Sequence, residues 1–177
     1  MMSSAFPERS SALLFKNPPS REWCAETDFV NTSAIGSIAL TWSPVGGFHH
    51  VGFVVGSIQS TAGAFATSLG AEWDGVIVHD PKQTVRVSFF QSKQRGDPLF
   101  ELIEPVGDSS PVASFAKRGG GLHHVCYVVD SLEQKLEESR AQRSLIVRSP
   151  VPAVAFGGRR IAWIYTRQKL LIEYLER

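Results

Sequence analysis

Most of this sequence is one structural unit that occurs twice. Residues 48–58 align with residues 122–132 at an offset of 74, and six of the eleven positions are identical. Residues 99–104 align with residues 171–176 at an offset of 72, so both ends of the unit recur. A repeat of this kind is one supersecondary unit, and its copies are expected to fold in the same way. The duplication is therefore the strongest constraint on the fold.

Each copy carries the pattern of a βαβββ unit. β-Branched and aromatic residues favour buried first strands over 51–55 and 125–129. Ser57 and Ser131 are suited to cap helices over 58–69 and 132–140, and Gly70 is suited to end the first helix. Three further strands are predicted in each copy, over 73–78, 85–91 and 99–103, and over 145–148, 160–165 and 169–175.

The two units are expected to form one α+β domain. A unit of about 55 residues buries only about 60% of its unfolded surface alone, so both copies should share one core. The chain has 177 residues, of which 43% are hydrophobic. We expect an N-terminal extension over 1–46, rich in Ser and Pro and partly irregular, with one strand over 31–42. The domain over 47–177 then comprises module one (47–106), a linker (107–120) and module two (121–177).

Charge and hydropathy exclude several classes of protein. The net charge of +1 argues against nucleic acid as the main partner, because such binding needs a surplus of Lys and Arg. No run approaches the roughly 18 apolar residues of a membrane span, and the first residues lack the pattern of a signal peptide. We therefore expect a cytoplasmic protein without a membrane partner. Cys24 and Cys126 do not make a disulfide framework or a Cys-rich zinc site.

Four of the five histidines lie in two doublets, His49-His50 and His123-His124. Because side chains alternate along a strand, we expect one member of each doublet to face the core side and the other to face away. The doublets occupy the start of the same strand in both copies. We assign His50 and His124 to the inner side, and expect His49 and His123 to be structural.

A glutamate recurs near the end of each unit. His50 precedes Glu101 by 51 residues, and His124 precedes Glu173 by 49. Both carboxylates lie in apolar runs, where a charge is costly without a cationic partner. A lone histidine or glutamate of this kind is more often structural, but its recurrence in both copies favours metal coordination about a pseudo-two-fold axis. Two imidazoles and two carboxylates suit Co, Ni, Zn, Mn or Fe, with an open position for a substrate oxygen.

With these residues identified, the chain resembles the vicinal oxygen chelate superfamily, and within it the methylmalonyl-CoA epimerase family. The resemblance spans about residues 48–176. It rests on the motifs His-Val-Gly (50–52), Glu-Leu-Ile-Glu-Pro-Val-Gly (101–107), Gly-Gly-Gly-Leu-His-His-Val (119–125), Gly-Gly-Arg-Arg-Ile (157–161) and Leu-Ile-Glu (171–173). It implies two paired βαβββ modules that form one open, cupped mixed β-sheet barrel around a metal site, and it implies a homodimer.

The resemblance also implies roles for particular residues. His50, Glu101, His124 and Glu173 would bind a divalent metal, and Glu173 would also act as an acid–base group. In the family, the metal binds a thioester carbonyl while a carboxylate removes the α-proton and a second acid returns it to the other face. The family's opposing group is a glutamate on the second strand of module one, where residues 75–78 have no carboxylate. Asp74 is the nearest one and is our candidate for the second catalytic residue.

These features predict a metal-dependent epimerase or isomerase that acts on the α-carbon of an acyl thioester, with a small molecule such as an acyl-CoA as substrate. A glyoxalase I-type lactoylglutathione lyase, which would use the same four ligands, is an alternative. A second alternative is a non-catalytic small-molecule-binding protein of the bleomycin-resistance type. An extradiol-type dioxygenase fits less well, because that chemistry uses two histidines and one carboxylate.

Overall fold

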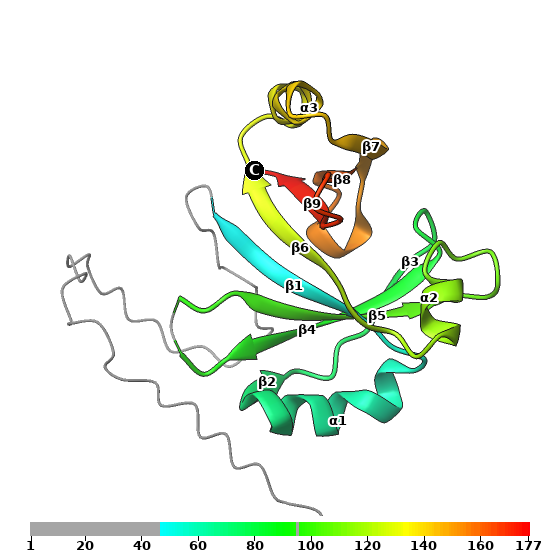
Figure 1. Ribbon diagram of the computed structural model, residues 1–177. Coiled ribbons are helices and arrows are strands. Elements are labelled where there is room, and N and C mark those ends of the chain that lie inside the picture. The colour runs from blue at the N-terminus through cyan, green and yellow to red at the C-terminus, as the bar shows by residue number, and fades with distance from the viewer. Residues whose placement is uncertain (1–46, 95) are drawn as a thin grey trace, which may run out of the picture. The chain divides into compact units, whose positions relative to one another are not determined.

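The described part of the chain folds as two modules joined by a short linker. The computed structural model describes residues 47–94 and 96–177. The expectations for residues 1–46, including Cys24 and the strand over 31–42, lie outside these residues. Module one contains β1 (Phe48–Val54), α1 (Ile58–Leu69), β2 (Ala71–Trp73), β3 (Val78–Asp80), β4 (Val85–Ser92) and β5 (Leu99–Pro105) (Figure 1). The linker carries α2 (Ala113–Lys117), and module two contains β6 (Gly121–Val129), α3 (Leu132–Ala141), β7 (Leu145–Pro152), the short 3-10 helix η1 (Val154–Phe156), β8 (Arg160–Tyr165) and β9 (Leu171–Glu176).

The strands of the described residues form one open mixed sheet. Their order is β2-β4-β5-β1-β6-β9-β8-β7, and β3 pairs with β4. Each module uses the same internal pairing, since β1 runs parallel to β5 and β6 runs parallel to β9. The two modules meet at the antiparallel pair of β1 and β6. This open α+β arrangement confirms the predicted fold class, and it brings the two histidine-bearing first strands together at the middle of the sheet (Figure 1).

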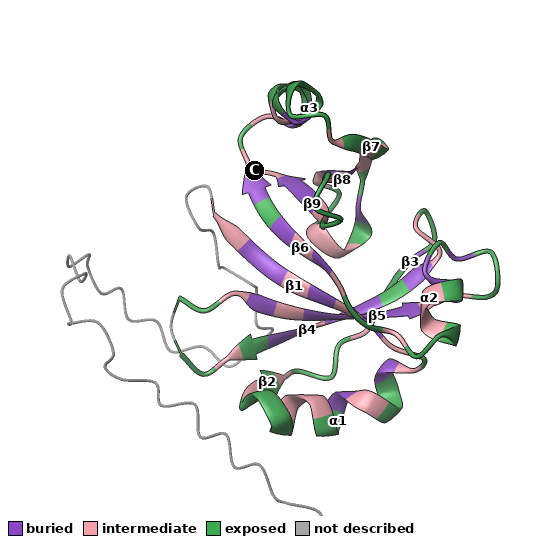
Figure 2. Cartoon of the chain, viewed as in Figure 1, coloured by how far each residue is buried: buried purple, intermediate pink, exposed green. Residues whose placement is uncertain are grey.

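Each helix covers one face of the strands of its own module. In module one, Ile58 of α1 packs with Phe90 and Leu102 on β4 and β5. In module two, Leu132 of α3 packs with Tyr174 and its neighbours on β8 and β9. The other side of the sheet has two further clusters of buried apolar residues: Val54, Val85, Val87, Ile103 and Val112, and Cys126, Val128, Ala153, Ile161 and Leu175. Figure 2 shows buried positions alternating with less buried ones along β1 and β6, and a more continuous buried run along β5.

The predicted helix ends are confirmed. Ser57 Oγ accepts a hydrogen bond from the Ser60 N–H at 3.4 Å, and Ser131 Oγ accepts one from the Gln134 N–H at 3.3 Å. Gly70 ends α1 with a φ of 61°, in the left-handed region that favours glycine. The sequence therefore sets the bounds of α1 and the start of α3.

The last strand of each module also anchors the helix of that module. The Glu104 carboxylate accepts from the Ile58 N–H at 2.8 Å and pairs with Arg86. In module two, the Glu176 carboxylate accepts from the Leu132 N–H at 3.4 Å and pairs with an arginine of β8. A carboxylate at a helix N-terminus satisfies free N–H groups and stabilises the helix dipole. These duplicated glutamates therefore serve the fold, whereas Glu101 and Glu173 point elsewhere.

One predicted strand is wrong, and two short helices were not predicted. The run over 73–78 is interrupted, because β2 ends at Trp73 and β3 begins at Val78. The Asp74 carboxylate accepts from the Val76 N–H at 2.9 Å, and Gly75 has a φ of 79°, so the backbone turns here. Neither α2 nor η1 has a periodic sequence pattern that would reveal it. Among the described residues, no helix combines the length and the apolar character needed to span a bilayer.

Candidate metal centre

Four side chains converge at the junction of the two modules. They are His50 on β1, Glu101 on β5, His124 on β6 and Glu173 on β9. The two Nε2 atoms lie 3.0 Å apart. His50 Nε2 lies 3.4 Å from Oε2 of each glutamate, and His124 Nε2 lies 3.5 Å from Glu101 Oε2 and 3.8 Å from Glu173 Oε2. The duplication thus brings together the four residues that the sequence singled out.

Burial controls the charge of this cluster. None of the four residues is more than 5% exposed. Burial lowers the pKa of His50 to about 3 and holds the pKa of His124 well below its ordinary value. Burial also raises the pKa of Glu101 and of Glu173, and the Glu101 charge raises the pKa of Glu173 further. Without a cation among them, the two carboxylates destabilise each other's ionised forms.

The donors fit a divalent transition metal. For bonds of about 2.1 Å, adjacent ligands lie about 3.0–3.4 Å apart, which is close to the separations found here. Oε2 of Glu173 is a buried oxygen with no hydrogen-bond partner in the described residues. Such an oxygen is costly unless a ligand satisfies it. Neutral imidazole nitrogens and carboxylate oxygens are a donor set that Zn, Co, Ni, Mn and Fe accept.

The predicted alternation within the histidine doublets is wrong. Both His49 and His50 contact the ring of Phe156, and both His123 and His124 contact the ring of Trp163. The members of each doublet therefore lie on the same side of the sheet, although they are consecutive in a strand.

Two β-bulges explain this arrangement. The register between β1 and β6 shifts between Phe48 and His50, which leaves His49 as an extra residue on β1. It shifts again between Gly52 and Phe53, which leaves His123 as an extra residue on β6. A bulge redirects a side chain and disrupts the alternation. Bulges at the two equivalent positions place both outer histidines beside the inner ones.

Gly52 is a residue whose role sequence reasoning missed. It lies opposite His124 in the register of β1 and β6. A Cβ at this position would lie 2.1 Å from His124 Cε1, so only glycine leaves room for the imidazole. The equivalent position of module two is Cys126, which lies opposite His50. A glycine inside an apolar strand often marks a close approach of another group, and this was the signal in the sequence that could have identified Gly52.

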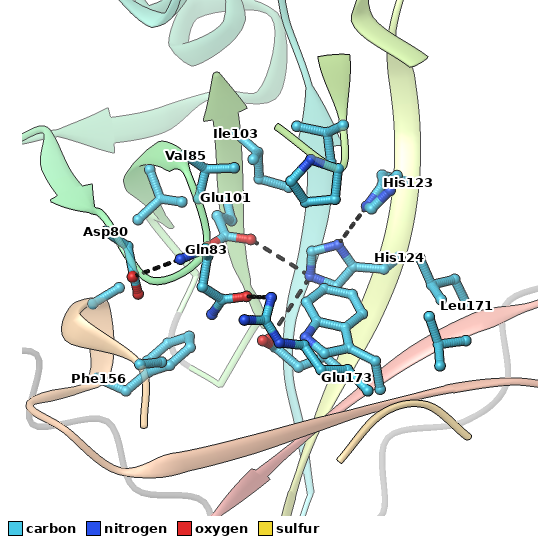
Figure 3. Close-up of a pocket in the computed structure, with 18 residues that line it drawn as sticks. Asp80, Gln83, Val85, Glu101, Ile103, His123, His124, Phe156, Leu171 and Glu173 are labelled. Carbon is cyan, nitrogen blue, oxygen red and sulfur yellow. Dashed lines mark hydrogen bonds and ion pairs between the residues drawn. The ribbon is translucent and has the colours of Figure 1, made fainter. Parts of the chain in front are cut away.

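The centre opens into a cavity of about 390 Å³. Glu101, His124 and Glu173 line it, and Figure 3 shows them on one wall with their side chains directed towards one another. Most of the remaining wall is apolar and comes from both modules and the linker: Val85, Val87, Ile103, Pro111, Val112, Val147, Ala153, Ala155, Phe156, Trp163 and Leu171. The cavity can therefore hold an apolar group next to the cluster.

Two charged residues complete the wall. Asp80 is buried, and its carboxylate accepts from three backbone N–H groups at 3.0–3.1 Å, including that of Val154 in module two. Arg148 of β7 reaches across to Gln83 and Lys82 of module one. Sequence reasoning missed both residues, because their roles depend on contacts between the modules.

Asp74 lies apart from the cluster. It is exposed, its carboxylate bonds the Val76 N–H, and it is not among the residues that line the cavity. The structure thus brings four of the five predicted site residues together and leaves Asp74 in the turn between β2 and β3. Its catalytic role remains a prediction.

Comparison with known proteins gives consistent matches. The family model of the glyoxalase/bleomycin resistance protein/dioxygenase superfamily matches residues 49–163. The ethylmalonyl-CoA/methylmalonyl-CoA epimerase of Cereibacter sphaeroides is 26% identical over 125 residues, which cover 70% of this chain and 90% of that protein. The uncharacterised protein YqjC of Bacillus subtilis is 32% identical over 133 residues, which cover 72% of this chain and 89% of that protein.

A solved structure shares the fold. Methylmalonyl-CoA epimerase of Streptomyces coelicolor, in complex with 2-nitronate-propionyl-CoA, matches with a TM-score of 0.62 at 20% identity. The match covers 73% of this chain and 96% of that chain. At this identity the match shows that the two proteins share the arrangement of strands and helices.

Proposed function

Because the chain belongs to the glyoxalase/bleomycin resistance protein/dioxygenase superfamily, we propose that it is a metal-dependent epimerase acting on the α-carbon of an acyl thioester. The observation that carries the proposal is the convergence of His50, Glu101, His124 and Glu173 beside a largely apolar cavity. A relative and a structural neighbour whose names give this activity support the choice of reaction.

The four converging residues would hold the metal. When bound, a divalent ion polarises a carbonyl oxygen and makes the adjacent α-hydrogen more acidic. The orphaned Oε2 of Glu173 and the facing Nε2 atoms of the two histidines are the donors that support this assignment. The imidazoles stay neutral because burial disfavours their charged forms, so their lone pairs are free to bind.

Glu173 and Glu101 would move the α-proton. They lie on strands of different modules and both line the cavity, so both carboxylates can reach a bound α-carbon. Proton transfer needs a group within hydrogen-bond reach of the α-carbon, and both carboxylates line the cavity beside the proposed metal. Asp80 is less suited, because backbone N–H groups occupy its oxygens.

Arg148 indicates an acidic acyl group. It lines the cavity, and its hydrogen bonds run to two neutral acceptors, Gln83 Oε1 at 3.4 Å and Lys82 O at 3.1 Å. Within the described residues, no carboxylate pairs with its guanidinium. Arginine binds carboxylates well, so a thioester with a second carboxylate, such as a methylmalonyl or ethylmalonyl thioester, would supply the missing partner.

Solvent exchange of the α-hydrogen tests this proposal. Protein loaded with Co²⁺ and incubated with methylmalonyl-CoA in D₂O should incorporate deuterium at the α-carbon faster than buffer containing the same metal. Glu173→Gln should remove the enzymatic exchange. Absence of exchange with methylmalonyl-CoA, ethylmalonyl-CoA and simple 2-methylacyl-CoA substrates would refute the assignment.

A glyoxalase I-type lyase is a second candidate. The observation in its favour is that none of the described residues of β2, β3 and the turn between them supplies a free carboxylate to the cavity. A lyase that uses the same four donors would not need that carboxylate. Formation of lactoylglutathione from methylglyoxal and glutathione would separate the two activities.

A third reading is a non-catalytic binding protein. Purified protein that takes up no stoichiometric metal would favour this reading over both enzymes.

A further inference from the structure

The four doublet histidines form a continuous line of imidazoles across the junction of β1 and β6. His49 Nδ1 lies 2.8 Å from His50 Nδ1, and His50 Nε2 lies 3.0 Å from His124 Nε2. His124 Nδ1 in turn lies 3.1 Å from His123 Nδ1. Each inner ring thus has one nitrogen directed at the metal centre and the other directed at an outer histidine.

Each of these contacts requires one hydrogen. Two ring nitrogens at hydrogen-bond distance must be one N–H donor and one bare acceptor. A neutral imidazole has one nitrogen of each kind, so the tautomer of one ring determines the tautomer of the next. Each of the three contacts needs a bare nitrogen on one of its two rings, so the geometry itself links the ring tautomers along the line.

We infer that His49 and His123 are positioning residues that hold His50 and His124 in the tautomer required for metal binding; this inference rests on the proposed function. When both Nε2 atoms of the inner rings are ligands, their hydrogens must sit on Nδ1. Those Nδ1–H groups then donate to Nδ1 of His49 and of His123, whose own hydrogens sit on Nε2. A ligand histidine usually donates its second N–H to a carboxylate, a carbonyl or water, and here a histidine takes that place.

The line also predicts a change in the metal-free protein. The central Nε2···Nε2 contact then holds one hydrogen, so one inner ring donates from Nε2 and has a bare Nδ1. Its outer neighbour must donate from Nδ1 to that atom. Metal binding therefore moves one hydrogen within that inner ring, from Nε2 to Nδ1, and one within its outer neighbour, from Nδ1 to Nε2. The four rings carry four ring N–H hydrogens before and after, so the change releases no proton.

The two bulges support this role. With regular alternation, the outer histidines would lie on the far side of the sheet and could not reach the inner rings. The bulges occur at equivalent places in both modules and turn both outer rings towards the centre. Structural packing alone would not require the same Nδ1-to-Nδ1 contact at both places.

Nitrogen chemical shifts of the rings test the inference directly. In uniformly ¹⁵N-labelled protein loaded with Zn²⁺, we expect Nδ1–H in His50 and His124 and Nε2–H in His49 and His123. In metal-free protein, the two inner rings should share one Nε2 hydrogen. Protonated Nδ1 atoms on both outer rings in the Zn²⁺ form would overturn the inference. If the protein takes up no Zn²⁺, the proposed function fails, and the metal-free spectrum still decides whether the line of hydrogen bonds exists.

Metal affinity provides a second readout. His49→Phe keeps a ring but removes the acceptor, and it should weaken Zn²⁺ binding by about 10–100-fold. His49→Asn places an amide oxygen near the Nδ1 position and should restore most of the affinity. His79 is exposed on β3, so His79→Phe is the matched control and should bind Zn²⁺ as the wild type does. Equal affinity of wild type and His49→Phe would overturn the role of His49.

Discussion

Gly52→Ala is the substitution with the most sharply defined effect on the centre. The new Cβ would lie 2.1 Å from Cε1 and 2.4 Å from Nδ1 of His124, whereas ordinary contacts begin at 3.4 Å. The imidazole would have to move by more than 1 Å. It has little room to do so, because its ring packs edge-on against the rings of Trp163 and His50. The distances between the ring centroids are 4.6 Å and 5.1 Å. We expect Nε2 of His124 to leave the cluster.

The size of the effect follows from this displacement. A misplacement of about 1 Å in a site can cost about 100-fold, so Co²⁺ affinity should fall by about that factor. Overpacking a buried position costs about 1–3 kcal/mol, and the metal-free variant should melt several degrees lower. Isothermal titration with Co²⁺ and thermal unfolding monitored by circular dichroism measure the two effects.

Gly56→Ala is the matched control. Gly56 follows the same strand, is exposed, and has nothing within 4 Å of an added Cβ. This variant should keep the Co²⁺ affinity and the melting temperature of the wild type. A Gly52→Ala protein that binds Co²⁺ as tightly as Gly56→Ala would refute the placement of the His124 ring over Gly52.

Three further predictions concern charge and cavity. In metal-free protein, burial raises the Glu101 pKa from 4.5 to about 7, so its stabilising contribution is complete below pH 4.5 and is lost as the pH rises through 7. Unfolded histidines titrate near about pH 6.5 in wild type and variant alike, so the measured quantity is the difference in melting temperature between wild type and Glu101→Gln. This difference should change in the direction of a less stable wild type as the pH rises from 4.5 to about 7 and should stay constant at higher pH; a difference that does not vary with pH would contradict the assignment. Arg148→Met should lower kcat/KM for methylmalonyl-CoA by about 10–100-fold and leave a 2-methylacyl-CoA without the second carboxylate little affected, whereas equal losses would exclude charge recognition. Asp80→Ala leaves three N–H groups without their acceptor and should cost about 2–4 kcal/mol in urea unfolding; an unchanged unfolding midpoint would show that this contact between modules is not stabilising.

The duplicated sequence predicts the parts of the fold that depend on local patterns. The apolar run after His50 forms a strand, and Ser57 and Gly70 bound the helix that follows it. Glu101 and Glu173 could be identified because a carboxylate recurs in an apolar run. These features depend on neighbours in the chain and on a comparison between the two copies.

The remaining features depend on contacts between distant residues. The bulges at His49 and His123 arise from the pairing of β1 with β6, which no local period reveals. The need for glycine at position 52 becomes visible only when the ring of His124 lies over it. Asp74 was a reasonable candidate by position, but an Asx turn directs its carboxylate to the Val76 N–H. Short-range polar contacts of this kind interrupt a strand without changing its apolar pattern.

Metal stoichiometry tests the central claim most directly. Wild-type protein titrated with Co²⁺ should bind one ion per chain, and His50→Ala and Glu173→Ala should each lose that ion while His79→Ala retains it. Circular dichroism should show that all three variants keep the fold. Binding of no ion by the wild type, or one ion bound with unchanged affinity by both His50→Ala and Glu173→Ala, would contradict a metal centre formed by these four residues.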